Sequence, residues 1–177
     1  MSQDSHSLPD AWHSLRSLTS ARIALGRAGG SLPTREWLDF RLCHAAARDA
    51  VHEPFGAEKI AQQLQSITGP CQIVSSEAHN RSLYLRRPDL GRRLSSNDQN
   101  VFAGIDQKPD VALIVTDGLS ATAVHANIVA LFKSLLPKLD AQAITCRPVV
   151  IVKFGRVGIQ DPIGEMLGAK ASVIFIG

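Results

Sequence analysis

The sequence predicts an α/β protein: a Rossmann-like three-layer domain with a parallel sheet, preceded by a small all-helical N-terminal domain. Two observations predict this class. After Pro70, apolar runs of strand length alternate with helix-like segments, whereas before it only helical patterns occur. These runs are apolar on both faces, as is typical of parallel strands that are covered by helices on both sides. We therefore expect residues 1–69 to form the helical domain and residues 70–177 the α/β domain.

The N-terminal part is predicted to be helical. The first ten residues are polar and are expected to be loose. Apolar spacing favours a short helix over residues 12–22, a longer helix capped by Thr34, and a third helix over residues 56–66. The buried side of the longer helix is expected to consist of Trp37, Leu38, Phe40, Leu42 and residues 45–47.

The second part is predicted to contain four strands and three helices. The expected strands are residues 71–77, 109–118, 147–155 and 171–177, and the expected helices are residues 87–105, 120–139 and 161–169. Asp161 and Pro162 form a pattern typical of a helix start, with Asp161 as the N-cap and Pro162 in the first turn.

Composition excludes several classes of protein. No apolar run approaches the roughly 20 residues that a membrane-spanning helix needs, and the sequence MSQDSHSLPDAW does not resemble a secretory signal. Three dispersed cysteines indicate reduced thiols of a cytosolic protein, and neither they nor the six histidines have the spacing of a zinc site. With 5% aromatic residues and no known signature, nucleic-acid binding is not indicated.

Positive charge is concentrated in the first half of the chain. Residues 1–93 contain 12 Lys/Arg and 9 Asp/Glu (+3), whereas residues 94–177 contain 7 of each. The arginines Arg86, Arg87, Arg92 and Arg93 surround Pro88 and Asp89. They favour either a protein interface or phosphate clamp, or simply a solvated surface. The Gly-rich residues 26–30 resemble a phosphate loop only weakly, and a hinge between helices fits them better.

The loops after the strands are the expected ligand sites, since ligands of open parallel sheets bind beyond the carboxyl ends of the strands. In the segment TDGLSAT, Ser120 is expected to cap the following helix and Gly118 to allow a tight turn. Asp117 could bind a cation or a hydroxyl, or the segment could be no more than a cap and a turn. His125 lacks the sequence context of a hydrolase base, so a catalytic triad is not supported.

The segment KFGRVGIQDPIGE is a second candidate loop. Two glycines flank Arg156 and Val157, so the backbone can approach something flat or bulky, although a plain strand–helix connection would also fit. The segment lacks the complete Gly-x-Gly-x-x-Gly pattern of dinucleotide-binding proteins, and NAD binding is therefore not indicated.

Four segments together resemble one family in order and spacing. They are LTSARIALGRAGGSLPTREWLDFRLCHAAARDAV, NRSLYLRRPDLGRRL, PDVALIVTDGLSATAV and FGRVGIQDPIGEMLGAK. All are similar to the small (light) subunit of ethanolamine ammonia-lyase, over nearly the whole chain from about Ser14 to Gly177. The family's usual NLYL is SLYL here.

The resemblance implies a subunit of a carbon–nitrogen lyase that uses adenosylcobalamin to convert ethanolamine into acetaldehyde and ammonia by a radical route. In that family a large subunit binds ethanolamine and carries most catalytic residues, and the small subunit covers the cobalamin at their interface in a hexamer of large–small pairs. The resemblance assigns a cofactor contact to Val157, and we expect Arg156 to donate to the amide or phosphate periphery. No catalytic residue is expected in this chain, which should be inactive alone.

The same resemblance implies two further cofactor contacts, a glutamate and a cysteine, beyond Gly177. We therefore expect a C-terminally truncated version of the family, with an incomplete α/β domain. Family members occur in the cytoplasm or in bacterial microcompartments, but the first twelve residues do not resemble a targeting helix. The alternative hypothesis is a stand-alone nucleotide- or anion-binding Rossmann-like module.

Overall fold

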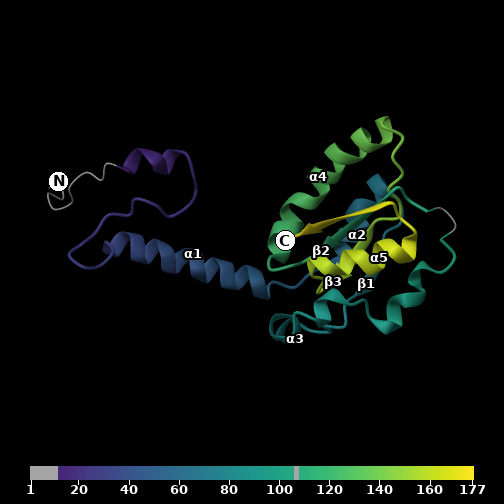
Figure 1. The fold of residues 1–177 in the computed structure, drawn as a ribbon, viewed down its shortest axis with the longest axis horizontal. Coiled ribbons are helices and arrows are strands. Elements are labelled where there is room, and N and C mark those ends of the chain that lie inside the picture. The colour runs from purple at the N-terminus through teal and green to yellow at the C-terminus, as the bar shows by residue number, and fades with distance from the viewer. Residues whose placement is uncertain (1–11, 106–107) are drawn as a thin grey trace. The chain divides into compact units, whose positions relative to one another are not determined.

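A computed structural model describes residues 12–105 and 108–177 (Figure 1). The chain forms two compact units, Met1–Arg48 and Asp49–Gly177. The predictions for the first ten residues, that they are loose and contain neither a signal nor a targeting helix, lie outside the described residues. Within the described ranges, none of the helices combines the length and apolarity that crossing a membrane requires.

The second unit contains a four-stranded sheet that confirms the α/β class. Its strands are β1 (Gln72–Ser75), β2 (Val111–Thr116), β3 (Val150–Lys153) and β4 (Ala171–Ile176). The spatial order is β1-β3-β2-β4, and every neighbouring pair is parallel. The four predicted strands therefore all form, although β3 begins three residues later than residue 147, where it was expected.

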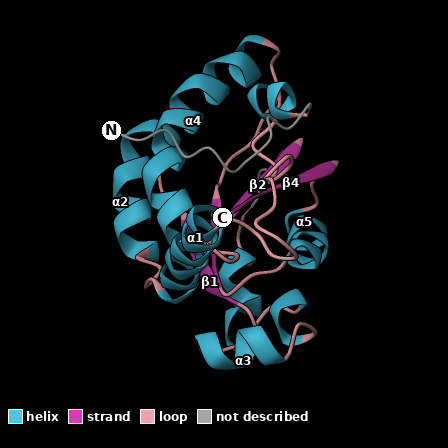
Figure 2. Cartoon of the chain, turned by 90° about the vertical axis from the view of Figure 1, so that its left-hand side faces the viewer, coloured by secondary structure: helices cyan, strands magenta, loops and turns pink. Residues whose placement is uncertain are grey.

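Helices cover both faces of the sheet (Figure 2). On one face, α2 (Ala57–Thr68) and α4 (Ala121–Ala141) share a core with Leu113, Val115 and Ile151. On the other face, α5 (Gln160–Leu167) and the 3₁₀ helix η3 (Ser96–Phe102) share a core with Ile114 and Val152. Successive strand residues thus alternate between two cores, which is the period-two pattern of a sheet buried on both sides.

The two central strands continue onto opposite faces of the sheet. The chain passes from β2 into α4 on one face and from β3 into α5 on the other. Adjacent parallel strands whose connections diverge in this way leave a crevice at their carboxyl ends. The loops that follow Thr116 and Lys153 therefore lie side by side at this point.

The first unit has less regular structure. It contains the 3₁₀ helix η1 (His13–Ser17) and most of α1 (Thr34–His52). The prediction of a short helix over residues 12–22 is confirmed only in part. Thr34 is the first residue of α1 rather than its cap, because the amide of Trp37 already donates to the Pro33 carbonyl.

The prediction of a buried side on α1 is wrong for this chain. None of the residues of α1 is buried, and Trp37, Leu38, Phe40 and Leu42 are 43–70% exposed. The apolar positions are spread around the helix instead of forming one stripe, so that the first unit alone cannot cover them.

The predicted helix over residues 87–105 is also wrong. This segment forms η2 (Leu90–Arg92) and η3, separated by an extended stretch in which the amide of Ser95 donates to the Ser75 carbonyl. Leu94 forms an antiparallel bridge with Ser76. Pairing beside the end of β1 replaces the helical hydrogen bonds at the middle of the segment.

Two further boundaries differ from the sequence predictions. The compact units divide between Arg48 and Asp49, whereas a boundary was expected at residue 69. The reason is α2, whose buried Ile60 and Leu64 belong to the core of the sheet. Helix α5 begins at Gln160, so Asp161 lies in its first turn and is not its N-cap.

Candidate functional site

The turn after β3, residues 154–157, lies at the crevice between the two central strands. Phe154 has a positive φ of 58°, a conformation that is unusual for a bulky residue. Gly155 is buried, and a Cβ atom placed there would lie 2.7 Å from the Thr116 Oγ1 atom. Glycine is therefore required at position 155 by the close approach of β2, as the sequence pattern predicted for one side of this turn.

Side chains from β2 and from the end of β1 hold the backbone of this turn. The Asp117 carboxylate accepts the Phe154 amide at 2.9 Å, and Thr116 Oγ1 accepts the Gly155 amide at 2.9 Å. The Ser76 hydroxyl donates to the Phe154 carbonyl at 2.7 Å. Two consecutive amides and one carbonyl are thus fixed by buried side chains, which stabilises the unusual φ of Phe154.

Asp117 is fully buried and forms an ion pair with Arg81. Arg81 Nη2 lies 2.8 Å from Asp117 Oδ2, and Nη1 donates to the Gly118 carbonyl at 2.8 Å. Burial raises the pKa of Asp117 above its ordinary value, and the positive charge of Arg81 acts in the opposite direction. Asp117, which could have bound a cation, instead has its acceptor atoms occupied by Arg81 and the turn.

Arg81 comes from α3 (Arg81–Arg86), a short helix capped by the Asn80 side chain, which accepts the Leu83 amide. Its guanidinium lies over the ring of Tyr84 at 5.1 Å and over that of Phe154 at 5.5 Å. Burial raises the pKa of Tyr84, whose hydroxyl donates to the Gly155 carbonyl at 3.3 Å. Helix α3 thus contributes a cation and a phenol to the group of side chains that holds the turn. We call this group, which consists of Ser76, Arg81, Tyr84, Thr116 and Asp117, the frame.

Arg156 is held by α3 rather than left free at the surface. Its Nη2 atom donates to the Tyr84 carbonyl at 2.9 Å, and its guanidinium lies 4.5 Å from the centre of the Tyr84 ring. The backbone amide of Arg156 donates to the Gly91 carbonyl at 2.8 Å. The structure therefore gives Arg156 a role in fixing the turn.

Val157 is the exposed residue of the turn. It begins the 3₁₀ helix η4 (Val157–Ile159) and is 52% exposed. The next residue, Gly158, lies against the side chain of Arg92, which a Cβ atom at this position would approach to 3.3 Å. Val157 is therefore an exposed apolar side chain that follows three residues, Phe154, Gly155 and Arg156, whose backbone amides are all hydrogen-bonded.

The loop after β2 contains a cap and a tight turn, and also supplies the Asp117 side chain to this frame. Ser120 accepts the Ala123 amide at the start of α4, and Gly118 has a positive φ of 52°, so both sequence predictions are confirmed. His125 accepts the Gly56 amide at 3.3 Å and stacks on Phe55. These contacts assign structural roles to the serine and the histidine.

Most of the arginine cluster is satisfied within the chain. Arg87 pairs with Asp89, Arg93 pairs with Glu77, and Arg86 donates to the Ser82 carbonyl. Arg92 differs, since no described residue contacts its guanidinium through a hydrogen bond or an ion pair, and its side chain is exposed.

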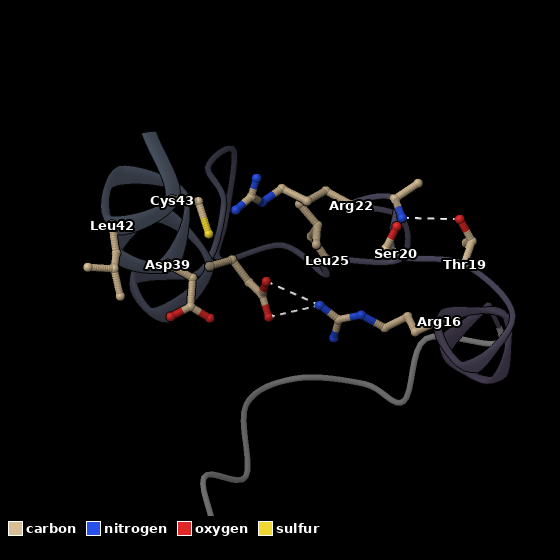
Figure 3. A pocket seen from close by; sticks show the side chains of 10 residues that line it. Arg16, Thr19, Ser20, Arg22, Leu25, Asp39, Leu42 and Cys43 are labelled. Atoms are coloured by element: carbon tan, nitrogen blue, oxygen red, sulfur yellow. Dashed lines mark hydrogen bonds and ion pairs between the residues drawn. The ribbon is translucent and has the colours of Figure 1, made fainter. Parts of the chain in front are cut away.

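A cavity of about 530 Å³ lies within the first unit (Figure 3). Arg16 spans it and donates to both carboxylate oxygens of Glu36 at 3.1 Å, which ties η1 to α1. The nearby Gly-rich segment closes on itself, because Ala28 and Ser31 exchange backbone hydrogen bonds. This segment is a tight turn in the structure, and the amide of Ala28 is occupied by the Ser31 carbonyl.

Comparison with known proteins identifies the family. Residues 9–177 match the family model described as "Ethanolamine ammonia-lyase light chain (EutC)". The chain belongs to the ethanolamine ammonia-lyase light-chain family. It is 47% identical to the ethanolamine ammonia-lyase small subunit of Pseudomonas aeruginosa (strain LESB58), over 98% of this chain and 67% of that protein.

Other relatives of the light-chain family agree. The small subunits of Ralstonia nicotianae (strain ATCC BAA-1114 / GMI1000) and Pseudomonas fluorescens (strain Pf0-1) are each 45% identical over 94% of this chain. The chain spans 63% and 62% of these two proteins, respectively. The family resemblance seen in the four sequence segments is thus confirmed, over about two thirds of the length of the relatives.

The structure brings together residues that sequence reasoning did not connect. Asp117 and Val157 were singled out separately, whereas Arg81, Tyr84 and Ser76 were not recognised as parts of the same frame. Arg81 is 36 residues from Asp117 along the chain, so no local pattern could have paired them. The one available signal was the short helix with an Asn cap, which places Arg81 and Tyr84 three residues apart on one face.

Proposed function

We propose that this chain is the cobalamin-covering part of the small subunit of an adenosylcobalamin-dependent ethanolamine ammonia-lyase. The observation that carries the proposal is Val157, an exposed apolar side chain on a fixed turn at the crevice of an α/β unit from the light-chain family. We also propose that this unit is a Rossmann-like three-layer domain whose strand ends face the partner.

The residues of the turn fit a large planar cofactor. A corrin has an apolar face and a polar rim of amides with one phosphate, so it needs an apolar contact with hydrogen-bond donors beside it. Val157 supplies the apolar contact, and the aliphatic stem of Arg92, whose guanidinium has no partner among the described residues, lies beside Gly158. When bound, the cofactor supplies the radical chemistry that converts ethanolamine into acetaldehyde and ammonia.

The residues of this chain act by positioning the turn that carries Val157. Asp117, Thr116 and Ser76 fix the backbone of the turn, and Tyr84 and Arg156 tie it to α3. A contact surface that is already ordered loses less conformational entropy when a ligand binds. In this proposal the chain excludes water from one side of the cofactor, and the large subunit binds ethanolamine and carries the catalytic groups.

The assembly and location follow from the same proposal. The active particle is a hexamer of large–small pairs, and this chain alone is inactive. The complex works in the cytoplasm or inside a bacterial microcompartment.

Reconstitution tests the proposed function. The small subunit with this sequence is mixed with the large subunit of ethanolamine ammonia-lyase, adenosylcobalamin and ethanolamine, and complex formation and acetaldehyde release are measured. Complex formation, with acetaldehyde released only when both subunits are present, supports the proposal. If no complex forms and ATP, NAD or phosphate raises the melting temperature of the chain while cobalamins do not, the chain is a nucleotide- or anion-binding module instead.

A further inference from the structure

Arg92 is distinguished from the other described arginines of its unit, because its guanidinium has no hydrogen-bond or ion-pair partner among the described residues. In residues 49–105 and 108–177, the guanidinium groups of Arg81, Arg86, Arg87, Arg93, Arg147 and Arg156 each contact a carboxylate or a backbone carbonyl. Arg92 has no such contact and its side chain is exposed. Its five N–H donors are therefore available to a ligand or to water.

The stem of Arg92 lies against Gly158, the residue that follows Val157. Its Cγ and Cδ atoms lie 3.3 and 3.5 Å from the position that a Cβ atom of Gly158 would occupy. The preceding residue, Gly91, accepts the backbone amide of Arg156 at 2.8 Å. The segment Gly91–Arg92 therefore contacts the residues on both sides of Val157, Arg156 through a backbone hydrogen bond of Gly91 and Gly158 through the stem of Arg92.

Gly158 makes room for the Arg92 stem. This glycine does not have a positive φ, so its conformation does not itself demand glycine. What distinguishes the position is the neighbouring side chain, since a Cβ atom would lie 3.3 Å from Arg92 Cγ, and the stem would have to shift by a few tenths of an ångström. Glycine at position 158 therefore lets the stem of Arg92 lie against the residue that follows the exposed Val157.

We propose that Arg92 is the residue of this chain that donates hydrogen bonds to acceptor oxygens at the rim of the ligand lying on Val157. This inference rests on the proposed function, which supplies a ligand with an apolar face and a rim of amides and one phosphate. Arg156, the expected donor, uses Nη2 on the Tyr84 carbonyl and stacks on the Tyr84 ring. Arg92 has its full donor set, and a guanidinium suits both amide and phosphate oxygens.

The test measures the affinity of the complex of small and large subunits for adenosylcobalamin, with wild-type, Arg92→Gln, Arg92→Lys and Arg93→Gln small subunits. Arg93 is the matched control, because it is the adjacent exposed arginine and its charge is paired with Glu77. We expect Arg92→Gln to weaken binding about ten-fold or more, since hydrogen bonds from charged donors are among the stronger ones. Arg92→Lys should lose less, and Arg93→Gln should bind as wild type.

Cobinamide, which lacks the nucleotide loop and its phosphate, distinguishes the two acceptors. If Arg92 donates to the phosphate, Arg92→Gln weakens binding of cobalamin but not of cobinamide. If Arg92 donates to a corrin amide, both ligands lose affinity. Either pattern supports the proposal.

If the complex with Arg92→Gln binds both ligands as tightly as the wild-type complex does, the inference is wrong. A Val157→Asp variant in the same series separates this failure from failure of the proposed function. If Val157→Asp loses affinity while Arg92→Gln does not, the cofactor lies at Val157 and Arg92 does not contact it. If both variants bind as wild type, the proposed function is wrong. Equal melting temperatures of the free variant subunits establish that the differences arise in binding.

Discussion

The side chains at the crevice act mainly by holding the backbone of the turn after β3 in one conformation. Asp117 is the central one, since its carboxylate connects Arg81 of α3 with the amide of Phe154 in the next loop. A buried ion pair of this kind adds little net stability, because desolvation offsets most of the attraction, but removing one partner leaves a charge uncompensated. The value of the pair therefore lies in fixing one geometry of the turn.

We expect Asp117→Asn to destabilise the chain by about 3 kcal/mol, because the mostly buried Arg81 loses its counter-charge. Chemical denaturation of wild type and variant measures this. Glu58→Gln is the control, since Glu58 forms an exposed ion pair with Lys153 and should cost less than about 1 kcal/mol. Combining Asp117→Asn with Arg81→Met should recover part of the loss. Equal costs for Asp117→Asn and Glu58→Gln would contradict the account.

Asp110 provides a pH-dependent test at the opposite end of the sheet. Lys170, and the side chain and amide of Thr145, hold the pKa of Asp110 well below its ordinary value. A lowered pKa in the folded state contributes stability above the pKa of the unfolded chain, and this contribution is lost as pH falls through the folded value.

The stability difference between wild type and Asp110→Asn should therefore be largest near neutral pH. It should shrink once the pH drops below about 4, the ordinary pKa of an aspartate. Urea unfolding of both proteins at a series of pH values measures this difference. A difference that stays constant down to acid pH would show that the charge of Asp110 does not stabilise the fold.

At the scale of elements, α1 differs from α2, α4 and α5, because none of its residues is buried. Both tryptophans of the chain are exposed, Trp12 to 66% and Trp37 to 50%. The Trp37 ring stacks on Phe40, which in turn lies under the Arg22 guanidinium. These local contacts leave half of the indole surface in water.

We expect the isolated chain to show the red-shifted fluorescence of solvated indoles, with strong quenching by iodide. The variant Trp37→Phe should remove a large part of the quenchable emission and thereby assign it to α1. Emission that is blue-shifted and protected from iodide would mean that α1 is covered in the free chain.

The elements also show what sequence could and could not predict. Strand β2 and helix α4 were predicted because a continuous apolar run and a Ser cap are local signals. The prediction of a helix over residues 87–105 was wrong, because this segment pairs with Ser75 and Ser76 instead of forming helical hydrogen bonds. In α1 the apolar residues were recognised, but periodicity does not reveal whether anything covers them.

For the molecule as a whole, the proposed cofactor-binding site lies at one edge of the sheet. The connections after β2 and β3 run to opposite faces of the sheet, and the buried Asp117 between them is paired with Arg81 and the Phe154 amide. What reaches the surface is Val157, with Arg92 beside Gly158. This arrangement fits the proposed role of a subunit that covers the cofactor while its partner carries the catalytic groups.

The site residues were predicted only to the extent that the family resemblance identified them. Val157 was expected as a contact from the motif, and its exposure agrees with that role without testing it. The sequence suggested Arg156 as the polar donor, since it precedes Val157. Its stacking on Tyr84, 72 residues away, depends on tertiary contacts that no local motif contains.

Cobalamin affinity of the complex of small and large subunits is the most direct test of the role of Val157. The comparison is between wild type, Val157→Asp and Met166→Asp, because Met166 is an exposed apolar residue further along the same stretch, on α5. We predict that Val157→Asp lowers the affinity ~100-fold or more, since an unpaired carboxylate against an apolar surface costs several kcal/mol, while Met166→Asp binds as wild type. Unchanged affinity of a folded Val157→Asp complex would contradict the placement of the cofactor on this turn.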